Sequence, residues 1–262
     1  MAVWYAVGTR RARRSWPAWR TALFLLGLLA ILAALVSPLD TLAAERFSFH
    51  MVQHMLLTVV AVPLLLVGQP VRPLLRGLPA EVRSGVVRPL ARSRAVRAIV
   101  HVLRHPLVAG ALYVGGLYAW HVPALYDAAL ADPRLHVAEH LWFLTTALLF
   151  WTCVIDPEPF RATLSYPARI IYLLLAGAAQ NTVLGGVLSF SSRLLYSGYA
   201  VTQRVGEDYL ERLTDQRVGG AVMWVTGDAI FLAAVSLSFF LWLDSEEQSE
   251  RRRERIAGKV NT

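Results

Sequence analysis

The amino-acid sequence predicts an all-α protein, a polytopic bundle of transmembrane helices. The chain of 262 residues is 56% hydrophobic and has a mean hydropathy of +0.46, which makes it more apolar than an ordinary soluble domain. Its apolar residues gather in stretches of about 20, the length of helix that crosses a bilayer core. Its 25 arginines stand in blocks between these stretches rather than evenly along the chain.

Six apolar segments are interpreted as membrane-spanning helices. Pro63 in the second segment and Gly185 with Gly186 in the fifth predict local kinks, which neighbouring helices in a membrane can accommodate. The first segment follows a long basic stretch and lacks a clean cleavage site, so we interpret it as an uncleaved helix. The predicted spans are approximately residues 22–38, 47–67, 107–129, 135–155, 168–190 and 218–243.

The arginine blocks predict the orientation, because short cytoplasmic loops collect positive charge. Five arginines precede the first span, and eight arginines against one acid, Glu81, separate the second span from the third. We therefore expect a basic cytoplasmic segment at 1–20, the helix bundle at 21–243 and a charged cytoplasmic tail at 244–262. The other connections then face outward.

Five histidines fall at the outer ends of three predicted spans. His50 with His54 and His136 with His140 each have the HxxxH spacing, which places two imidazoles on one face of a helix. His121 lies near the outer end of the third span. Imidazoles without a thiolate favour copper, zinc, iron or nickel over calcium or magnesium. The sequence therefore predicts one metal site at the outer face, formed by these five residues.

Methionines near this predicted site favour copper as its metal. Met51 and Met55 adjoin the first histidine pair, and Met223 lies in the last span on the same side. Thioether sulfur together with imidazole favours copper, although packing as adaptable apolar filler is the ordinary role of methionine. The single cysteine, Cys153, excludes an internal disulfide and a CxxC metal site, and we interpret it as a small buried hydrophobe.

Polar residues deep in the predicted spans are further candidates. Asp228 lies about ten residues into the last span, where an ionisable group costs about 2.5–3.5 kcal/mol on insertion and normally has a partner. We expect it to accept a hydrogen bond from a ligand imidazole or to handle protons. Asn181 is expected at least to join helices. His101 and His105 stand among cytoplasmic arginines and are interpreted as solvated loop residues.

These motifs in combination resemble the CtaG family, the cytochrome c oxidase assembly factors of Gram-positive bacteria. The resemblance rests on FSFHMVQHMLL, WHVPALYDAAL, LHVAEHLWFLTTALLFW, QNTVLG and DQRVGGAVMWVTGD, and it covers residues 25–243. It implies a multi-pass cell-membrane protein that assembles haem-copper oxidase and delivers copper to it, with oxidase subunits and the lipid bilayer as partners. Family members often have a seventh span. The family residues that carry over are His50, His54, His121, His136, His140, Asn181 and Asp228.

The expected function is therefore that of a non-enzymatic assembly factor that binds copper at the extracytoplasmic face. One alternative is an intramembrane zinc hydrolase with Asp228 as base, although this residue lies roughly 10–15 Å along its helix from the histidines. Haem ligation would need one histidine per helix and would leave the HxxxH doubling unexplained. A copper importer would need ligands on the inner side as well. Nucleic-acid binding is not expected, since no soluble module remains to carry it.

Overall fold

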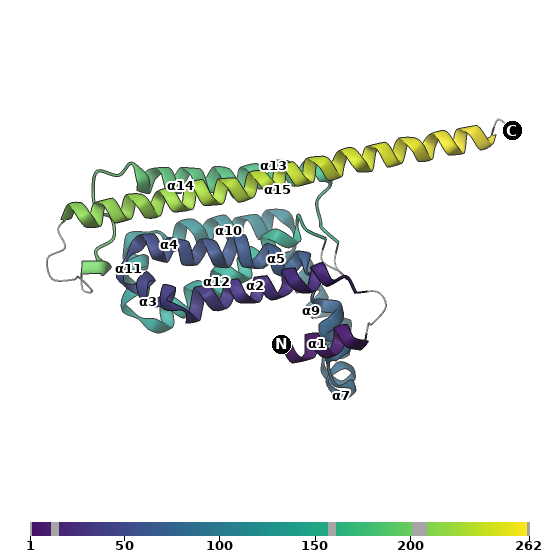
Figure 1. Cartoon of the computed structure of the whole chain (residues 1–262), viewed down its shortest axis with the longest axis horizontal. Helices are drawn as coiled ribbons and strands as arrows, with labels where there is room; N and C mark the ends of the chain where they lie inside the picture. Colours follow the sequence, from purple (N-terminus) through teal and green to yellow (C-terminus); the bar gives the residue numbers. More distant parts are fainter. Residues whose placement is uncertain (1, 12–15, 157–160, 201–208, 261–262) are drawn as a thin grey trace.

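The protein is a bundle of long helices with a single very long helix at its edge. The computed structural model describes residues 2–11, 16–156, 161–200 and 209–260, and these residues contain no β-strand. The predicted all-α fold is therefore confirmed. Figure 1 shows the long helices lying alongside one another, with the C-terminal part of α15 (Tyr209–Val260) extending beyond the bundle at one end.

Helices occur at the positions of all six predicted spans, but not all of them suit a membrane crossing. Four are long and apolar enough, and a fifth results if α9 (Arg94–Leu103) and α10 (Pro106–Trp120), which meet at 63°, count as one bent span. Among the described residues, α12 (Pro133–Thr152) is not one of them, because its two charged residues and two histidines lower its mean hydropathy. The six predicted spans are thus slightly more than the four or five that the structure supports. The four are α2 (Ala18–Val36), Phe47–Val67, Tyr166–Ser189 and α15.

The third predicted span is not one continuous helix. Helix α10 ends at Trp120, and a second helix, α11 (Pro123–Ala131), begins after Val122. Val122 is extended, with φ −64° and ψ 124°, because the ring of the following Pro123 disfavours the helical conformation in the residue before it. The break leaves His121 at the C-terminus of α10.

Irregular backbone in the second and fifth spans takes the form of π-helical segments. In the second span, the π segment ends just before Pro63, which lacks the N–H that a regular helix needs. In the fifth span, the π segment ends well before Gly185 and Gly186, which lie in regular α-helix, so the kink predicted there was wrongly placed. The segments are α4 (Phe47–Met55), η1 (Leu56–Ala61) and α5 (Val62–Val67), and α13 (Tyr166–Tyr172), η3 (Leu173–Ala178) and α14 (Ala179–Ser189).

Gly185 serves the packing of α14 against α15 instead. A Cβ atom on Gly185 would lie 2.8 Å from the carbonyl oxygen of Gly220 and 3.0 Å from the backbone nitrogen of Trp224, whereas a Cβ on Gly186 would meet nothing within 4 Å. We expect Gly185→Ala to lower the stability of the detergent-solubilised protein by about 1–3 kcal/mol, because backbone cannot move aside cheaply. Gly186→Ala is the matched control and should leave the unfolding temperature unchanged or slightly raised. Equal unfolding temperatures for the two variants would contradict this account.

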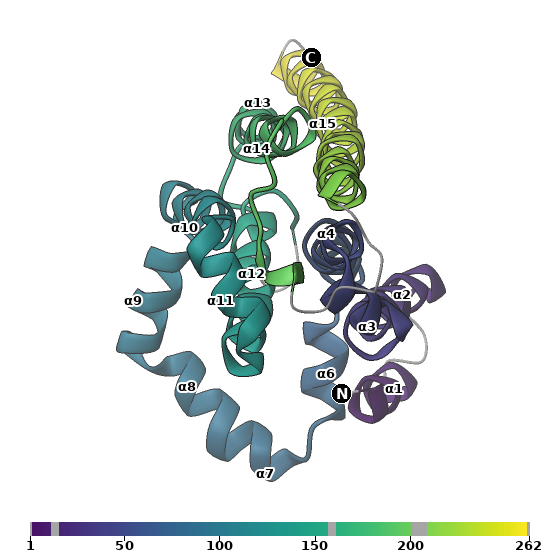
Figure 2. The same ribbon diagram turned by 90° about the vertical axis from the view of Figure 1, so that its left-hand side faces the viewer.

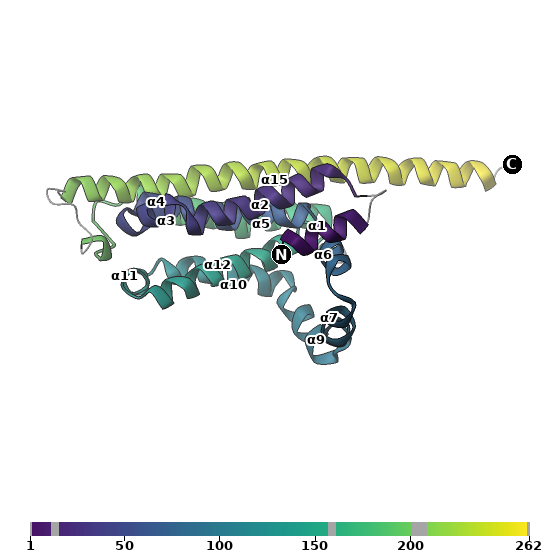
Figure 3. The same cartoon turned by 60° about the horizontal axis from the view of Figure 1, so that its bottom comes forward.

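The arginine-rich connection between the second and third spans is helical, not an open loop. Its short helices form an arc that leaves the bundle beside α1 (Ala2–Arg11) and returns at α10, and Figures 2 and 3 show it projecting from one end of the long helices. His101 lies within α9 and His105 precedes α10; both are exposed, as expected, but neither is in a loop. The arc consists of α6 (Val71–Gly77), α7 (Ala80–Val82), η2 (Arg83–Val87), α8 (Arg88–Arg92) and α9.

The opposite end of the bundle carries the five histidines of the predicted metal site. Helices α4 and α12 both begin at this end, where α3 (Pro38–Glu45) and α11 also lie (Figure 1). Side-chain hydrogen bonds stabilise both starts, a local one at α12 and one from another helix at α4. The Asp132 side chain accepts a hydrogen bond from the backbone nitrogen of Arg134 at 2.8 Å and caps α12. The backbone nitrogen and hydroxyl of Ser48, at the start of α4, donate to Asp215 of α15.

Candidate metal centre

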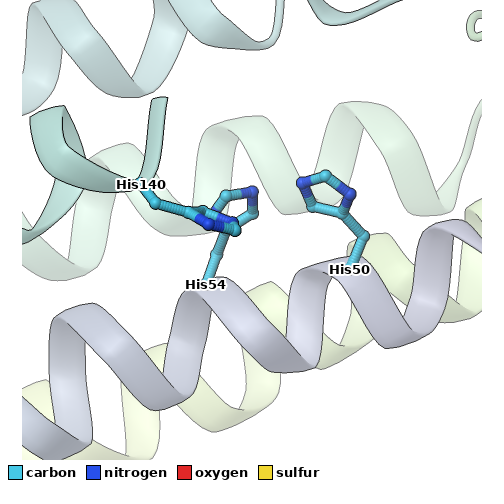
Figure 4. A group of neighbouring side chains, drawn as sticks. All are labelled: His50, His54 and His140. Atoms are coloured by element: carbon cyan, nitrogen blue, oxygen red, sulfur yellow. The ribbon is translucent and has the colours of Figure 1, made fainter. Parts of the chain in front are cut away.

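The two HxxxH pairs face each other across the space between α4 and α12. The ring centroids of His50 and His136 are 5.2 Å apart, and those of His54 and His140 are 5.3 Å apart. Within each pair the rings are 4.4 and 4.3 Å apart, as one helical turn requires. Figure 4 shows His50 and His54 rising from one face of α4, with the ring of His140 reaching the ring of His54 from α12. The four imidazoles therefore form two stacked layers.

Three of these imidazoles are buried, and all four have ring nitrogens without hydrogen-bond partners among the described residues. The exposed fractions of His50, His54 and His140 are 0%, 4% and 7%. Both ring nitrogens of His50 and His54, and Nε2 of His136 and His140, make no hydrogen bond within the described part of the chain. A buried polar group without a partner costs about 1–3 kcal/mol. Several such groups at one place therefore mark a candidate ligand site.

The sequence prediction missed a fifth member of this cluster, Glu139. Its side chain is fully buried, with Oε1 at 3.5 Å from Nε2 of His54 and Oε2 at 4.0 Å from Nε2 of His50. Neither oxygen accepts a hydrogen bond from a described residue. Two signals could have found it: Glu139 follows His136 by three positions and so shares its helix face, and it is an acid inside a predicted span.

The ligand atoms converge in two groups of three. One group is His50, His54 and His140, the other is His50, His136 and Glu139, and within each group one ligand atom per residue lies within 4.8 Å of the others. Imidazole nitrogens with a single carboxylate oxygen suit copper, zinc and iron. The unpartnered nitrogens and oxygens thus fit the copper ion that was expected from the sequence, and three protein ligands leave coordination positions open.

His121 lies beside this cluster rather than within it. Its Nδ1 donates a hydrogen bond to the carbonyl of Leu117 at 2.7 Å, and its Nε2 is buried without a partner among the described residues. His121 and His54 line a cavity of about 20 Å³, enough for one water molecule, which Met55 and Met223 also line. The fifth predicted histidine is therefore adjacent to the candidate metal ligands.

The other candidates are placed by their packing. Met51 is fully buried in an apolar cluster with Phe47 and Tyr126, the ordinary role of methionine. Nδ2 of Asn181 donates to the carbonyl of Met223 at 2.6 Å and so joins α14 to α15.

Asp228 is bound away from the histidines. Its Oδ2 accepts a hydrogen bond from the Thr182 hydroxyl at 2.6 Å. This bond joins α15 to α14, so among the described residues Asp228 is not bonded to a ligand imidazole as expected. Its Oδ1 has no partner among the described residues. The carboxyl group that does contact the imidazoles is that of Glu139.

Aromatic side chains cover the end of the bundle above His50. The hydroxyls of Tyr126 and Tyr199 are hydrogen-bonded at 2.6 Å, and Tyr196 donates to the carbonyl of His121 at 3.1 Å. The ring of Tyr126 lies 5.3 Å from that of His50. Burial raises the pKa of both Tyr196 and Tyr199, which keeps their phenols protonated. His136 is partly exposed, whereas the other three imidazoles are buried. It is therefore the outermost imidazole of the cluster.

HxxxH spacing alone does not make such a site. His101 and His105 have the same spacing, but α9 ends at Leu103, between them, and both side chains are exposed at the other end of the bundle. They provide a natural control for the buried pairs.

Comparison with known proteins supports the resemblance. A family model described as cytochrome c oxidase caa3 assembly factor matches residues 3–245. Uncharacterized proteins of Mycobacterium bovis and Mycobacterium tuberculosis are each 27% identical over 98% of this chain and 39% of their own length, and one of Mycobacterium leprae is 26% identical over 96% and 38%. The chain thus spans about two fifths of the curated relatives it matches. No solved structure matches it.

Proposed function

This chain belongs to the cytochrome c oxidase caa3 assembly factor family, and we propose that it binds copper at its histidine cluster and supplies that copper to the oxidase. The observation that carries the proposal is the convergence of four imidazoles and the Glu139 carboxyl group between α4 and α12, where six ring nitrogens and both carboxyl oxygens are buried without hydrogen-bond partners among the described residues. A bundle that only needed to pack would not bury so many unpaired polar atoms.

The donor set suits a carrier better than a permanent holder of copper. Each group of three offers two or three imidazoles, and open positions let an incoming ligand of the recipient bind before the donor's ligands have left. His50 together with His54 and His140, or with His136 and Glu139, would bind and orient the ion, and the burial of all of these except His136 excludes bulk water from it. The ion is cargo, so we propose that the protein acts without catalysing a reaction.

We further propose that the metal centre faces the extracytoplasmic side. Positive charge marks cytoplasmic segments, and the arginines of α6 to α9 lie at the end of the bundle opposite the histidines. Both termini would then be cytoplasmic, and copper would be supplied from the outer face of a bacterial cell membrane.

An intramembrane zinc hydrolase is the second candidate, because two histidines and a glutamate are also the donor set of several zinc hydrolases. His50, His136 and Glu139 supply such a set. Against it, Asp228, the base that this reading needs, hydrogen-bonds Thr182 instead.

Metal analysis tests the proposal and separates it from this rival. The full chain, purified in detergent without a polyhistidine tag, is expected to retain copper in stoichiometric amount. Oxidase from a strain lacking the gene is expected to contain haem but too little copper. Bound zinc together with hydrolysis of a lipid or an amide would favour the hydrolase. A copper-replete oxidase in the deletion strain would contradict the proposal.

A further inference from the structure

We infer that the cluster offers one copper ion two overlapping positions that share His50, and that the ion moves between them without leaving the protein. This inference rests on the proposed function and describes the path of the ion within the same site. The outer position consists of His50, His136 and Glu139, and the inner position of His50, His54 and His140.

The two groups have one ligand in common and four that differ. His50 belongs to both, and in each group one ligand atom per residue lies within 4.8 Å of the others. Glu139 connects the groups a second time, since its Oε1 is 3.5 Å from Nε2 of His54 in the inner group. A single compact site would bring ligand atoms of all five side chains equally close to one another, but among the described residues they converge only in these two groups of three.

The two positions are stacked along the bundle. His54 and His140 each lie one helical turn, about 5.4 Å, further into their helices than His50 and His136. Both helices begin at the same end of the bundle (Figure 1). His136 is partly exposed, whereas the exposed fractions of His54 and His140 are 4% and 7%. His136 is the one partly exposed ligand of either group, so the entrance lies at the outer position; its other two ligands, His50 and Glu139, are buried like those of the inner position.

Transfer between the positions is an exchange of ligands. The bonds from copper to a nitrogen of His136 and an oxygen of Glu139 break, and bonds to nitrogens of His54 and His140 form. His50 supplies a nitrogen throughout, and the oxidation state of the ion does not change. Retaining one ligand avoids setting a bare cation free in an apolar bundle, where an unpaired charge is very costly.

Binding of Cu²⁺ to single variants tests the shared ligand. Metal-free full chain without a polyhistidine tag is titrated with Cu²⁺ against a competing chelator, and electron paramagnetic resonance reports the donor atoms. Wild type is expected to bind one ion. His136→Ala should leave the inner position with three nitrogens, and His140→Ala should leave the outer position with fewer nitrogens and an oxygen, each within about tenfold of wild-type affinity.

His50→Ala is expected to weaken binding by at least about 100-fold, because it removes a ligand from both positions, and loss of groups outside the coordination shell alone costs roughly 10–100-fold. His101→Ala is the control, with unchanged affinity. Two ions per wild-type chain, identical spectra for His136→Ala and His140→Ala, or equal losses in all three cluster variants would overturn the inference while leaving the proposed function intact. Failure of wild type to bind copper would instead overturn the proposed function.

Discussion

Replacing Glu139 with leucine is expected to weaken copper binding by up to about tenfold, since the inner group keeps its three imidazoles, and, at the same time, to raise the unfolding temperature of the metal-free protein. The carboxyl group is fully buried and lacks a hydrogen-bond partner among the described residues. Without a cation this burial destabilises the fold by about 1–3 kcal/mol, and an apolar side chain of similar size removes the cost. With a cation, the same group supplies an oxygen ligand and a compensating negative charge.

Opposite signs for the two effects distinguish a metal ligand from a structural acid. Thermal unfolding in detergent and Cu²⁺ titration measure them separately. Glu139→Gln keeps the shape of the side chain but loses its charge, so it should weaken copper binding with little change in stability. Glu81→Leu replaces an exposed acid of α7 and should change neither quantity. A Glu139→Leu protein that unfolds earlier and still binds copper normally would show that the carboxyl group only supports the fold.

Replacing His50 and His54 together with leucine is expected to reduce oxidase activity in cells to the level of a strain that lacks the gene. The double variant removes the shared ligand and one inner ligand, so neither group of three remains. Leucine fills the space of the two buried rings with apolar side chains, and the protein should still reach the membrane in normal amount, because the apolar character of Phe47–Val67 increases.

The matched control is His101→Leu with His105→Leu, which removes an HxxxH pair of the same spacing from the other end of the bundle. This variant should retain full oxidase activity and full oxidase copper content, measured in isolated membranes. Equal losses from the two double variants, at equal protein levels, would show that the buried pair has no special role.

Much of the fold follows from local sequence. Long apolar stretches predicted helices at all six positions, and the structure has helices there. Two features were misplaced, the continuity of the third span and the kink in the fifth, and each depends on a single residue. Pro123 forces Val122 out of helical conformation and divides the third span. Gly185 lies in regular α-helix instead, where the absence of a side chain allows α14 to approach Gly220 of α15 closely.

The site was predicted only in part, for a similar reason. Histidine spacing indicated which residues share a helix face, and four of the five predicted ligands do come together. His121 is turned aside by its hydrogen bond to the Leu117 carbonyl. Asp228 was expected to reach a ligand imidazole because it is an acid deep in a predicted span. Its described partner is Thr182 on the neighbouring helix, which no sequence pattern reveals.

The sequence by itself determined that this is a helical membrane protein with imidazole pairs one turn apart, because hydropathy and i, i+4 spacing are properties of a single helix. Only the tertiary structure decided which pairs form a site. Helices α4 and α12 begin at the same end and lie in register, so His50 meets His136 and His54 meets His140, with Glu139 beside them. Relative depth and rotation of two helices arise from packing between them, which a one-dimensional pattern does not encode.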